Sequence, residues 1–234
     1  MSQIAAIDAV ILCGGLGTRL QPVVPDRPKA LAAIQGTPFL DILVDDLRRQ
    51  GIRRFVFCVG HMKEQIIAHF SGRTDSDYFF SAEDSPLGTG GAVRNAQPLI
   101  RSDPFLVLNG DSFCRVDYAA LLRFHQAKRS ALTVVAAPIR NRDDGGTLQL
   151  DQEGRLVSFQ EKSTAPAARF INAGVYLMPL DIVRGWLPDR PFSLERDVFP
   201  QLAATRRCFG FAVDSDVIDI GTPDRYQGAQ SGLS

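Results

Sequence analysis

The stretch Asp8–Arg19, which reads DAVILCGGLGTR, decides the class of fold. Its first part, Asp8–Leu12, is a short apolar run typical of a buried strand. Three glycines follow, at a point where the chain would turn from a strand into a helix. Glycine adopts tight turns at low cost, and backbone N–H groups in such a turn can point at a bound ligand. The stretch therefore predicts a strand, then an anion-binding turn that leads into a helix.

Outward from this strand, the chain alternates strand-like and helix-like segments. Apolar runs predict further strands over 55–59, 78–81, 105–108, 132–136 and 174–177. Apolar residues at helical spacing predict helices over 39–50, 62–70, 91–100, 118–128 and 194–204. The segment 145–161 reads as a hairpin with its turn at 151–154, which would add an antiparallel edge or a flap near the active face.

This alternation implies right-handed crossovers and a mainly parallel sheet with helices on both faces. The length of 234 residues suffices for one well-packed domain and is marginal for two. We therefore expect residues 1–234 to form a single Rossmann-like α/β domain, with a mixed, mostly parallel sheet flanked by helices. Ligands of such sheets bind outside the carboxyl ends of the strands, which here carry the sequences CGGLGTR, VGH and NGDS.

The balance of charge restricts the partners. Lys and Arg together number 26, as do Asp and Glu, so the net charge is zero. No excess of positive charge exists to attract phosphate backbones, which argues against nucleic-acid or membrane-surface binding. No apolar stretch has membrane-spanning length, and the N-terminus lacks the features of a signal peptide. Four scattered cysteines predict buried free thiols in a reducing cytoplasm.

Two familiar phosphate-binding motifs do not fit the glycine turn. A P-loop needs Lys-Ser or Lys-Thr after its last glycine, whereas Thr18-Arg19 follows Gly17 here. A dinucleotide fingerprint needs a third glycine where Leu20 stands, and an acidic residue to hold a ribose, which the second strand lacks. The turn alone is therefore weak evidence for any particular ligand.

Two cations strengthen the case for an anion. Arg19 and Lys29 follow the glycines, separated by a segment that three prolines stiffen, namely Pro22, Pro25 and Pro28. A stiff arm of this kind can return Lys29 toward the turn. Two fixed cations and several N–H groups around one point suit a triphosphate, although both could instead be surface cations on a loop.

The segment 14–20, GGLGTRL, together with Pro28-Lys29 resembles the signature of the sugar-1-phosphate nucleotidylyltransferases. The likeness continues in family order through SPLGTGGAVRNA (85–96), LNGDS (108–112), FQEKS (159–163), INAGVYLM (171–178), FSLERDVFP (192–200) and DIGTPDRY (219–226). Within the family, the chain is most similar to the guanylyltransferases that act on D-glycero-α-D-manno-heptose 1-phosphate. The resemblance implies attack by a sugar-1-phosphate oxygen on the α-phosphorus of a nucleoside triphosphate, with pyrophosphate leaving.

The resemblance also implies roles for the charged residues. Arg19 would neutralise the leaving pyrophosphate, and Lys29 would hold the α-phosphate or the incoming phosphate. Asp111 and Asp219 are the candidate Mg²⁺ ligands, since Mg²⁺ needs few carboxylates beside phosphate oxygens and water. The alternative is structural: Asp111 would begin a turn, and Asp219 would cap a helix that begins near Pro223.

On the sugar side, the resemblance assigns Lys162 to the sugar phosphate and Glu161 to the sugar hydroxyls. Asn109, Asn172 and the backbone at Gly146 would complete that pocket. Glu161 and Lys162 could instead be a solvated pair on a strand edge. Many relatives carry Tyr-Gly where this chain has Gly145-Gly146, and proline where it has Ser163. That serine is common among the heptose-specific relatives and favours a heptose.

Choice of base depends mainly on Glu83 and Gly88. A carboxylate accepts hydrogen bonds only, which suits the two neighbouring donors of guanine. It could also accept the single N3–H of uracil or thymine, so GTP ranks first and UTP or dTTP second. Glu83 could also be only a solvated loop residue. The full set of expected nucleotide-binding residues is Leu12, Gly14, Gly15, Gly17, Thr18, Glu83, Gly88 and Thr89.

We therefore expect a Mg²⁺-dependent cytoplasmic enzyme that joins GTP and a heptose 1-phosphate for surface polysaccharide synthesis. The alternatives are a uridylyl- or thymidylyltransferase, a mannose-1-phosphate guanylyltransferase, and a non-catalytic sugar-nucleotide sensor. Retention of both cations and both aspartates disfavours the sensor. The sequence leaves open whether the protein forms a homodimer.

Overall fold

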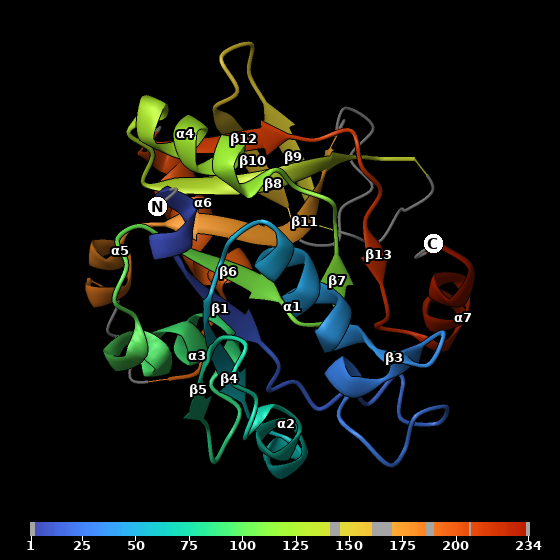
Figure 1. Ribbon diagram of the computed structural model, residues 1–234. Coiled ribbons are helices and arrows are strands. Elements are labelled where there is room, and N and C mark those ends of the chain that lie inside the picture. The colour runs from blue at the N-terminus through green and yellow to red at the C-terminus, as the bar shows by residue number, and fades with distance from the viewer. Residues whose placement is uncertain (1–2, 141–145, 161–169, 186–189, 206, 233–234) are drawn as a thin grey trace.

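The computed structural model describes residues 3–140, 146–160, 170–185, 190–205 and 207–232, and it centres on a nine-stranded sheet (Figure 1). One path through the sheet runs β10-β9-β11-β6-β1-β4-β5, and β8 and β12 extend it from β11. The strands of this sheet are β1 (Asp8–Leu12), β4 (Arg54–Val59), β5 (Asp77–Ala82), β6 (Phe105–Asn109), β8 (Leu132–Pro138), β9 (Thr147–Leu150), β10 (Leu156–Gln160), β11 (Phe170–Met178) and β12 (Cys208–Ala212).

One half of the sheet is parallel, because β1 lies between β4 and β6, and β4 pairs with β5. The carboxyl ends of these strands consequently meet at one edge. The other half is organised around β11, which is antiparallel to β6, β8 and β9. The predicted mixed α/β sheet is therefore confirmed, and so is the hairpin, because β9 and β10 pair antiparallel.

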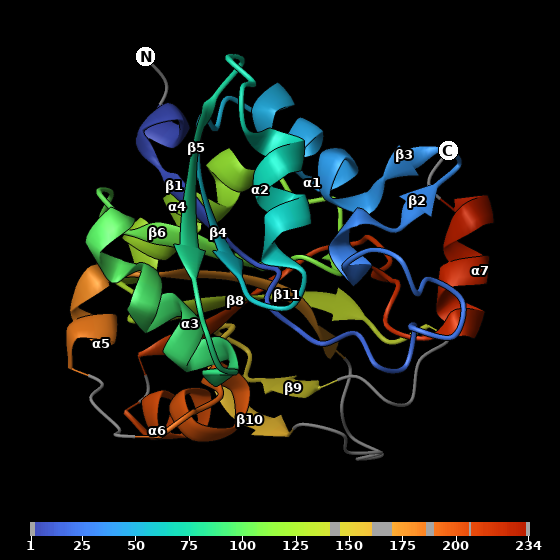
Figure 2. The same cartoon turned by 90° about the horizontal axis from the view of Figure 1, so that it is seen from below.

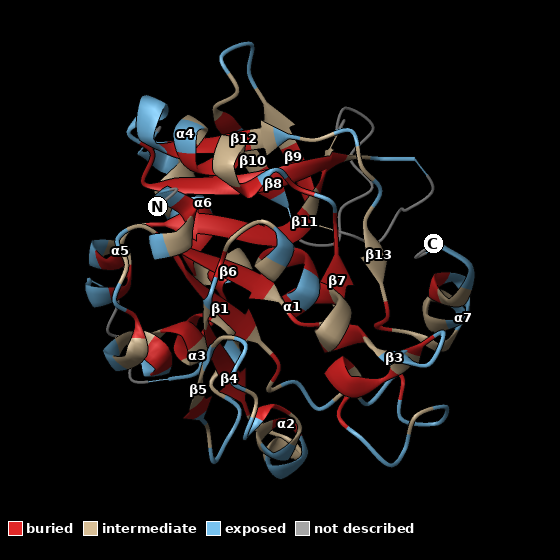
Figure 3. Ribbon diagram, viewed as in Figure 1, coloured by how far each residue is buried: buried red, intermediate tan, exposed pale blue. Residues whose placement is uncertain are grey.

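Helices cover both faces of the sheet (Figure 2). They are α1 (Phe39–Arg49), α2 (Lys63–Phe70), α3 (Gly88–Ala96), α4 (Tyr118–Lys128), α5 (Leu180–Arg184), α6 (Phe199–Ala204) and α7 (Pro223–Gly232). Alternate residues of β1 serve two cores: Ile11 packs in the cluster with α1, α2 and α4, whereas Val10 packs in the cluster with α3, α5 and α6. Buried residues accordingly concentrate in the sheet, with exposed ones on the outer helix faces (Figure 3).

Short elements connect these layers. Three are 3₁₀ segments and one is a single π turn: η1 (Gln3–Ala6), η2 (Lys29–Leu31), η3 (Gln97–Leu99) and η4 (Leu194–Val198). Two small ribbons pair β2 (Ala33–Ile34) with β3 (Thr37–Pro38), and β7 (Ser112–Phe113) with β13 (Ile218–Asp219). The second ribbon brings the C-terminal segment onto the loop that follows β6.

The expected helix directly after the glycine turn is wrong. Residues 18–23 form successive turns instead, in which Gly17 and Leu20 carbonyls each accept two N–H groups. Pro22 and Pro25 cannot donate to a helical ladder, so the segment cannot propagate as a helix. The predicted helix at 194–204 begins as the π segment η4 and becomes α-helical only from Phe199.

Two further observations concern the cysteines and the apolar character of the helices. All four cysteines are buried and free, as predicted. Within the ranges described, no helix combines the length and apolar character needed to cross a bilayer.

Candidate active site

The glycine loop sits over the carboxyl ends of three parallel strands. It is tied down on both sides, because Cys13 N–H donates to the Cys58 carbonyl (2.8 Å) and Gly110 N–H donates to the Leu12 carbonyl (2.9 Å). Within the loop, Gly14 packs so closely on Glu83 that a Cβ there would lie 2.7 Å from Glu83 Oε1. Glycine is needed at this position because of that close approach.

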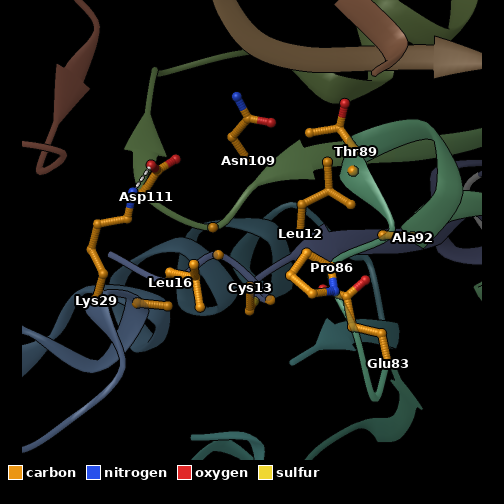
Figure 4. Close-up of a pocket in the computed structure, with 15 residues that line it drawn as sticks. Leu12, Cys13, Leu16, Lys29, Glu83, Pro86, Thr89, Ala92, Asn109 and Asp111 are labelled. Atoms are coloured by element: carbon orange, nitrogen blue, oxygen red, sulfur yellow. Dashed lines mark hydrogen bonds and ion pairs between the residues drawn. The ribbon is translucent and has the colours of Figure 1, made fainter. Parts of the chain in front are cut away.

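A cavity of about 290 Å³ opens beside the loop (Figure 4). Nine residues expected from the sequence line it: Leu12, Gly14, Gly15, Lys29, Glu83, Gly88, Thr89, Asn109 and Asp111. Six others were not anticipated, namely Cys13, Leu16, Ala30, Pro86, Ala92 and Gly110. Four of these six lie within motifs that carry the family resemblance, namely Leu16, Pro86, Ala92 and Gly110, so the motifs were the signal that could have found them.

Lys29 and Asp111 lie at one end of this cavity and form an ion pair (Figure 4). Lys29 begins η2, directly after the proline-containing arm, and Asp111 follows β6. Both side chains are only partly exposed. The arm therefore returns Lys29 to the glycine loop, as the sequence predicted.

Asp219 is brought to Asp111 by the ribbon of β7 and β13. Asp219 is the register partner of Ser112, and Ile220 N–H donates to the Asp111 carbonyl (3.0 Å). The Ser112 hydroxyl lies 3.4 Å from an oxygen of each carboxylate, Asp111 Oδ1 and Asp219 Oδ2. The two predicted metal ligands are thus neighbours, although they are far apart in the sequence.

The donor set fits Mg²⁺. Asp111 and Asp219 would provide two hard oxygen ligands, which lie near the same Ser112 hydroxyl, and Mg²⁺ would take its remaining ligands from substrate phosphates and water. Across the described ranges, no group of three or more His, Cys, Asp and Glu side chains forms a metal cluster.

Arg19 lies on the same side of the molecule, with an exposed side chain. A Cβ built at Gly221 would lie 3.0 Å from Asp219 Oδ1 and 3.7 Å from an Arg19 guanidinium nitrogen. Arg19, Lys29, Asp111 and Asp219 therefore gather from four separate segments. Their individual roles stay predictions.

Glu83 occupies the other end of the cavity. It follows β5, and its carboxylate points toward Pro86 and the glycine loop (Figure 4). Oε2 accepts the Leu87 N–H at 3.2 Å, and burial raises the pKa of this carboxyl above its ordinary value. Glu83 is therefore a pocket residue held in place by its backbone partner, and the alternative of a fully solvated loop residue is disfavoured.

Gly88 and Thr89 begin α3 and line the cavity. The Thr89 hydroxyl is already engaged within the protein, because it donates to Glu195 Oε2 (2.7 Å) and accepts from Leu194 N–H (2.9 Å). This bond fixes the start of α3 to η4. Glu195 was not singled out as a site residue, although it lies within the motif FSLERDVFP (192–200).

The predicted sugar side is represented by three described residues. Asn172 N–H donates to the Gly146 carbonyl (2.8 Å), and its side chain donates to the Tyr176 hydroxyl (2.7 Å) and accepts from Gly174 N–H (2.9 Å). Asn109 lies against Gly174, where a Cβ would come within 2.8 Å of its amide nitrogen. Glu161 and Lys162 lie outside the described residues.

Six predicted residues do not line the cavity itself: Gly17, Thr18, Arg19, Gly146, Asn172 and Asp219. Gly17 and Lys29 line a second, smaller hollow, together with Arg27 and His61. Thr18 is exposed in the turn that follows the glycines. The site is therefore broader than the cavity, and extends from it across the loop to β13.

Residues 8–233 match the family described as Nucleotidyl transferase. The D-glycero-alpha-D-manno-heptose 1-phosphate guanylyltransferase of Aneurinibacillus thermoaerophilus is 33% identical over 228 residues, which cover 97% of this chain and 98% of that enzyme. The mannose-1-phosphate guanylyltransferase of Mycobacterium tuberculosis is also 33% identical, over 94% of this chain. The chain spans only 62% of that enzyme's length.

A solved structure shares both fold and sequence with this chain. The crystal structure of HddC from Yersinia pseudotuberculosis complexed with GMP-PN superposes with a TM-score of 0.85, at 33% identity, covering 97% of this chain and all of that one. The resemblance found in the motifs is thus confirmed over nearly the full length. The chain belongs to the nucleotidyl transferase family.

Proposed function

We propose that the protein is a Mg²⁺-dependent guanylyltransferase that joins GTP and D-glycero-α-D-manno-heptose 1-phosphate to give GDP-heptose and pyrophosphate. The observation that carries this proposal is the meeting of the Lys29–Asp111 pair with Asp219 at one end of a cavity that has Glu83 at the other. A phosphate chain at the first end would place a base near the second. The relatives named as guanylyltransferases support the same reading.

The proposed reaction needs alignment and charge neutralisation more than a protein nucleophile. A sugar-phosphate oxygen attacks the α-phosphorus, and the bond from that phosphorus to the pyrophosphate oxygen breaks. Lys29 holds the α-phosphate beside Asp111, and the exposed Arg19 neutralises the departing pyrophosphate. Bound Mg²⁺, held by Asp111 and Asp219, would stabilise negative charge on the phosphate oxygens.

Base selection falls to Glu83. Its carboxylate is aimed into the cavity and can accept the N1–H and amino hydrogens of guanine. The GMP-PN complex of HddC shows a guanine nucleotide analogue on a 33% identical protein with this fold. Uracil and thymine offer one donor to such a group, so UTP and dTTP are the weaker alternatives.

The proposed function extends to the location and the partners of the protein. We assign residues 1–234 to one catalytic domain that acts in the cytoplasm and binds no nucleic acid or membrane. Its product would feed surface polysaccharide synthesis. The sugar side would use Asn109, Asn172 and Gly146, together with Glu161 and Lys162, and a homodimer is compatible with the chain.

Mannose 1-phosphate is the second candidate substrate, because the Mycobacterium tuberculosis relative of that specificity has the same identity to this chain. The test is a matrix of five nucleoside triphosphates against heptose, mannose and glucose 1-phosphates with Mg²⁺, read as released pyrophosphate. We expect the fastest release with GTP and heptose 1-phosphate. Faster release with mannose 1-phosphate, or with UTP or dTTP, would reassign the substrate, and no release with any pair would favour the sensor.

A further inference from the structure

The two oxygens of Asp219 have different surroundings. Oδ1 accepts the Gly221 N–H at 2.8 Å and a guanidinium N–H of Arg225 at 3.1 Å. Oδ2 lies 3.4 Å from the Ser112 hydroxyl, on the side of Asp111. Arg225 and Gly221 therefore hold one oxygen, and the other lies by the Ser112 hydroxyl, toward the second carboxylate.

Asp111 repeats this arrangement. Its Oδ2 is paired with Lys29, while its Oδ1 lies 3.4 Å from the same Ser112 hydroxyl. Each carboxylate thus has one oxygen held by a cation and one oxygen at the shared hydroxyl. Lys29 and Arg225 thus each pair with one of the two carboxylates, and the Arg19 guanidinium lies close by.

Arg225 is held where it is by the docking of its own helix. It lies in the first turn of α7, and the next residue, Tyr226, donates its hydroxyl to the Ala33 carbonyl at 2.8 Å. Gln230, one turn later, donates to the same carbonyl at 2.9 Å. Ala33 follows η2, which Lys29 begins, so one backbone segment positions both cations.

We propose that Arg225 is a positioning residue for the metal: it fixes Asp219 and balances its charge, so that a divalent cation enters with the triphosphate and binds only weakly alone. The proposal rests on the proposed function, in which Asp111 and Asp219 are the Mg²⁺ ligands. The triphosphate supplies the negative charge that the carboxylate pair, already neutralised by Lys29 and Arg225, does not.

The charge of Arg225 predicts the direction in which its removal changes the affinity for free metal. A guanidinium beside a metal ligand repels a divalent cation, so loss of its charge should strengthen binding of the free metal. At a separation of a few ångströms in a water-accessible site, this repulsion corresponds to about tenfold in Kd. If Arg225 served only to orient Asp219, its loss would instead weaken metal binding.

The experiment measures binding of Mn²⁺ alone to the full chain by electron paramagnetic resonance, first without nucleotide. Arg225→Gln keeps a donor for Oδ1 and removes the charge, and Arg225→Lys keeps the charge. The matched control is Arg49→Gln, which removes an exposed charge paired with Asp46 on α1. We expect Arg225→Gln to bind free Mn²⁺ about tenfold more tightly, with Arg225→Lys and Arg49→Gln at the wild-type Kd.

An unchanged or higher Kd for Mn²⁺ in Arg225→Gln would overturn the proposal. Tighter binding of Mn²⁺ by Arg225→Lys or Arg49→Gln would also overturn it. Circular dichroism checks that each variant is folded, and Arg225→Asn, which also keeps a side-chain donor without the charge, replaces the Gln variant if that one does not fold. A second titration with GTP present separates this proposal from the proposed function. If wild-type protein with GTP binds no more Mn²⁺ than GTP does without protein, or if Asp219→Asn leaves that additional binding intact, the metal assignment itself fails.

Discussion

At the scale of single residues, Glu83 has the most direct consequence for specificity. Its carboxylate lies between Gly14 and Gly60, close enough that a Cβ at either glycine would come within 2.8 Å of Oε1. The carboxylate is thus a half-buried acceptor beside the cavity. A base that presents hydrogen-bond donors to this acceptor gains affinity, and one that presents acceptors loses it.

Glu83→Gln should therefore reduce the preference for GTP over UTP. An amide offers a donor in place of one acceptor, and loss of a hydrogen bond to a charged group typically costs about 1.5–3 kcal/mol, or roughly 10–100-fold in selectivity. The measurement is kcat/KM for both nucleotides with the same sugar phosphate. Asp84→Gln, which alters an exposed neighbour paired with Lys63, is the control. An unchanged ratio in Glu83→Gln would mean that the base is recognised elsewhere.

Glu83 also predicts how GTP binding depends on pH. Burial raises the pKa of this carboxyl above 4.5, so protonation begins at a higher pH than for an exposed glutamate. Only the ionised form accepts both guanine donors, so affinity for GTP should fall as the pH drops toward the raised pKa. Titrations of GTP binding across this range should show the fall in wild-type protein. A profile equally steep in Glu83→Gln would contradict the assignment.

At the scale of elements, the site depends on backbone approaches that only small residues permit. β11 contains Gly174 at φ +71°, and there the strand passes so close to β6 that a Cβ would meet the Asn109 amide. The irregular register between β11 and β8 falls in the same part of the strand. This glycine therefore links the shape of the sheet to the placement of Asn109 on the sugar side.

Gly174→Ala should destabilise the protein by about 1–3 kcal/mol, because a positive φ and a contact with Asn109 both oppose a side chain. Gly228→Ala is the matched control in α7, where a Cβ would meet nothing within 4 Å. Helix propensity predicts a gain of roughly 0.5–1 kcal/mol for that change. Urea unfolding measures both, and equal effects of the two substitutions would refute the account of β11.

Elements whose apolar residues follow a regular pattern over several residues could be predicted from the sequence, and elements without such a pattern could not. β1, β4 and α1 were predicted because their patterns are regular over five or more residues. The ribbon of β7 and β13 has two-residue strands, which carry no period, so the meeting of Asp111 and Asp219 rested on family resemblance. The helix expected after Gly17 failed because prolines in 22–28 interrupt it.

At the scale of the whole molecule, two hydrophobic cores on opposite faces of the sheet hold the site in place. Among the described residues, His125 on α4 is the one buried histidine. Its Nδ1 lies 2.9 Å from the Thr133 hydroxyl on β8. Burial lowers its pKa to about 4, from 6.5. The neutral form is therefore the one that the folded protein accommodates.

This shift predicts a loss of stability in mild acid. Stability from His125 is complete above pH 6.5 and is lost as the pH falls toward 4, because the unfolded chain takes up the proton first. The expected loss between pH 7.5 and pH 5 is about 2 kcal/mol. Urea unfolding at both values should show this loss in wild-type protein and a smaller one in His125→Gln. The same loss in both proteins would assign it to other groups, and His61→Gln serves as the control.

The central claim is that Asp111, paired with Lys29 and adjacent to Asp219, lies at the reacting phosphate, and release of pyrophosphate from GTP and heptose 1-phosphate by Asp111→Asn tests it most directly. The account predicts a loss of about 10³-fold or more in kcat, with the fold intact by circular dichroism and GTP still bound. Asp26→Asn, an exposed carboxylate on the proline-containing arm, should keep the wild-type rate. Pyrophosphate release by folded Asp111→Asn at the wild-type rate would contradict the account.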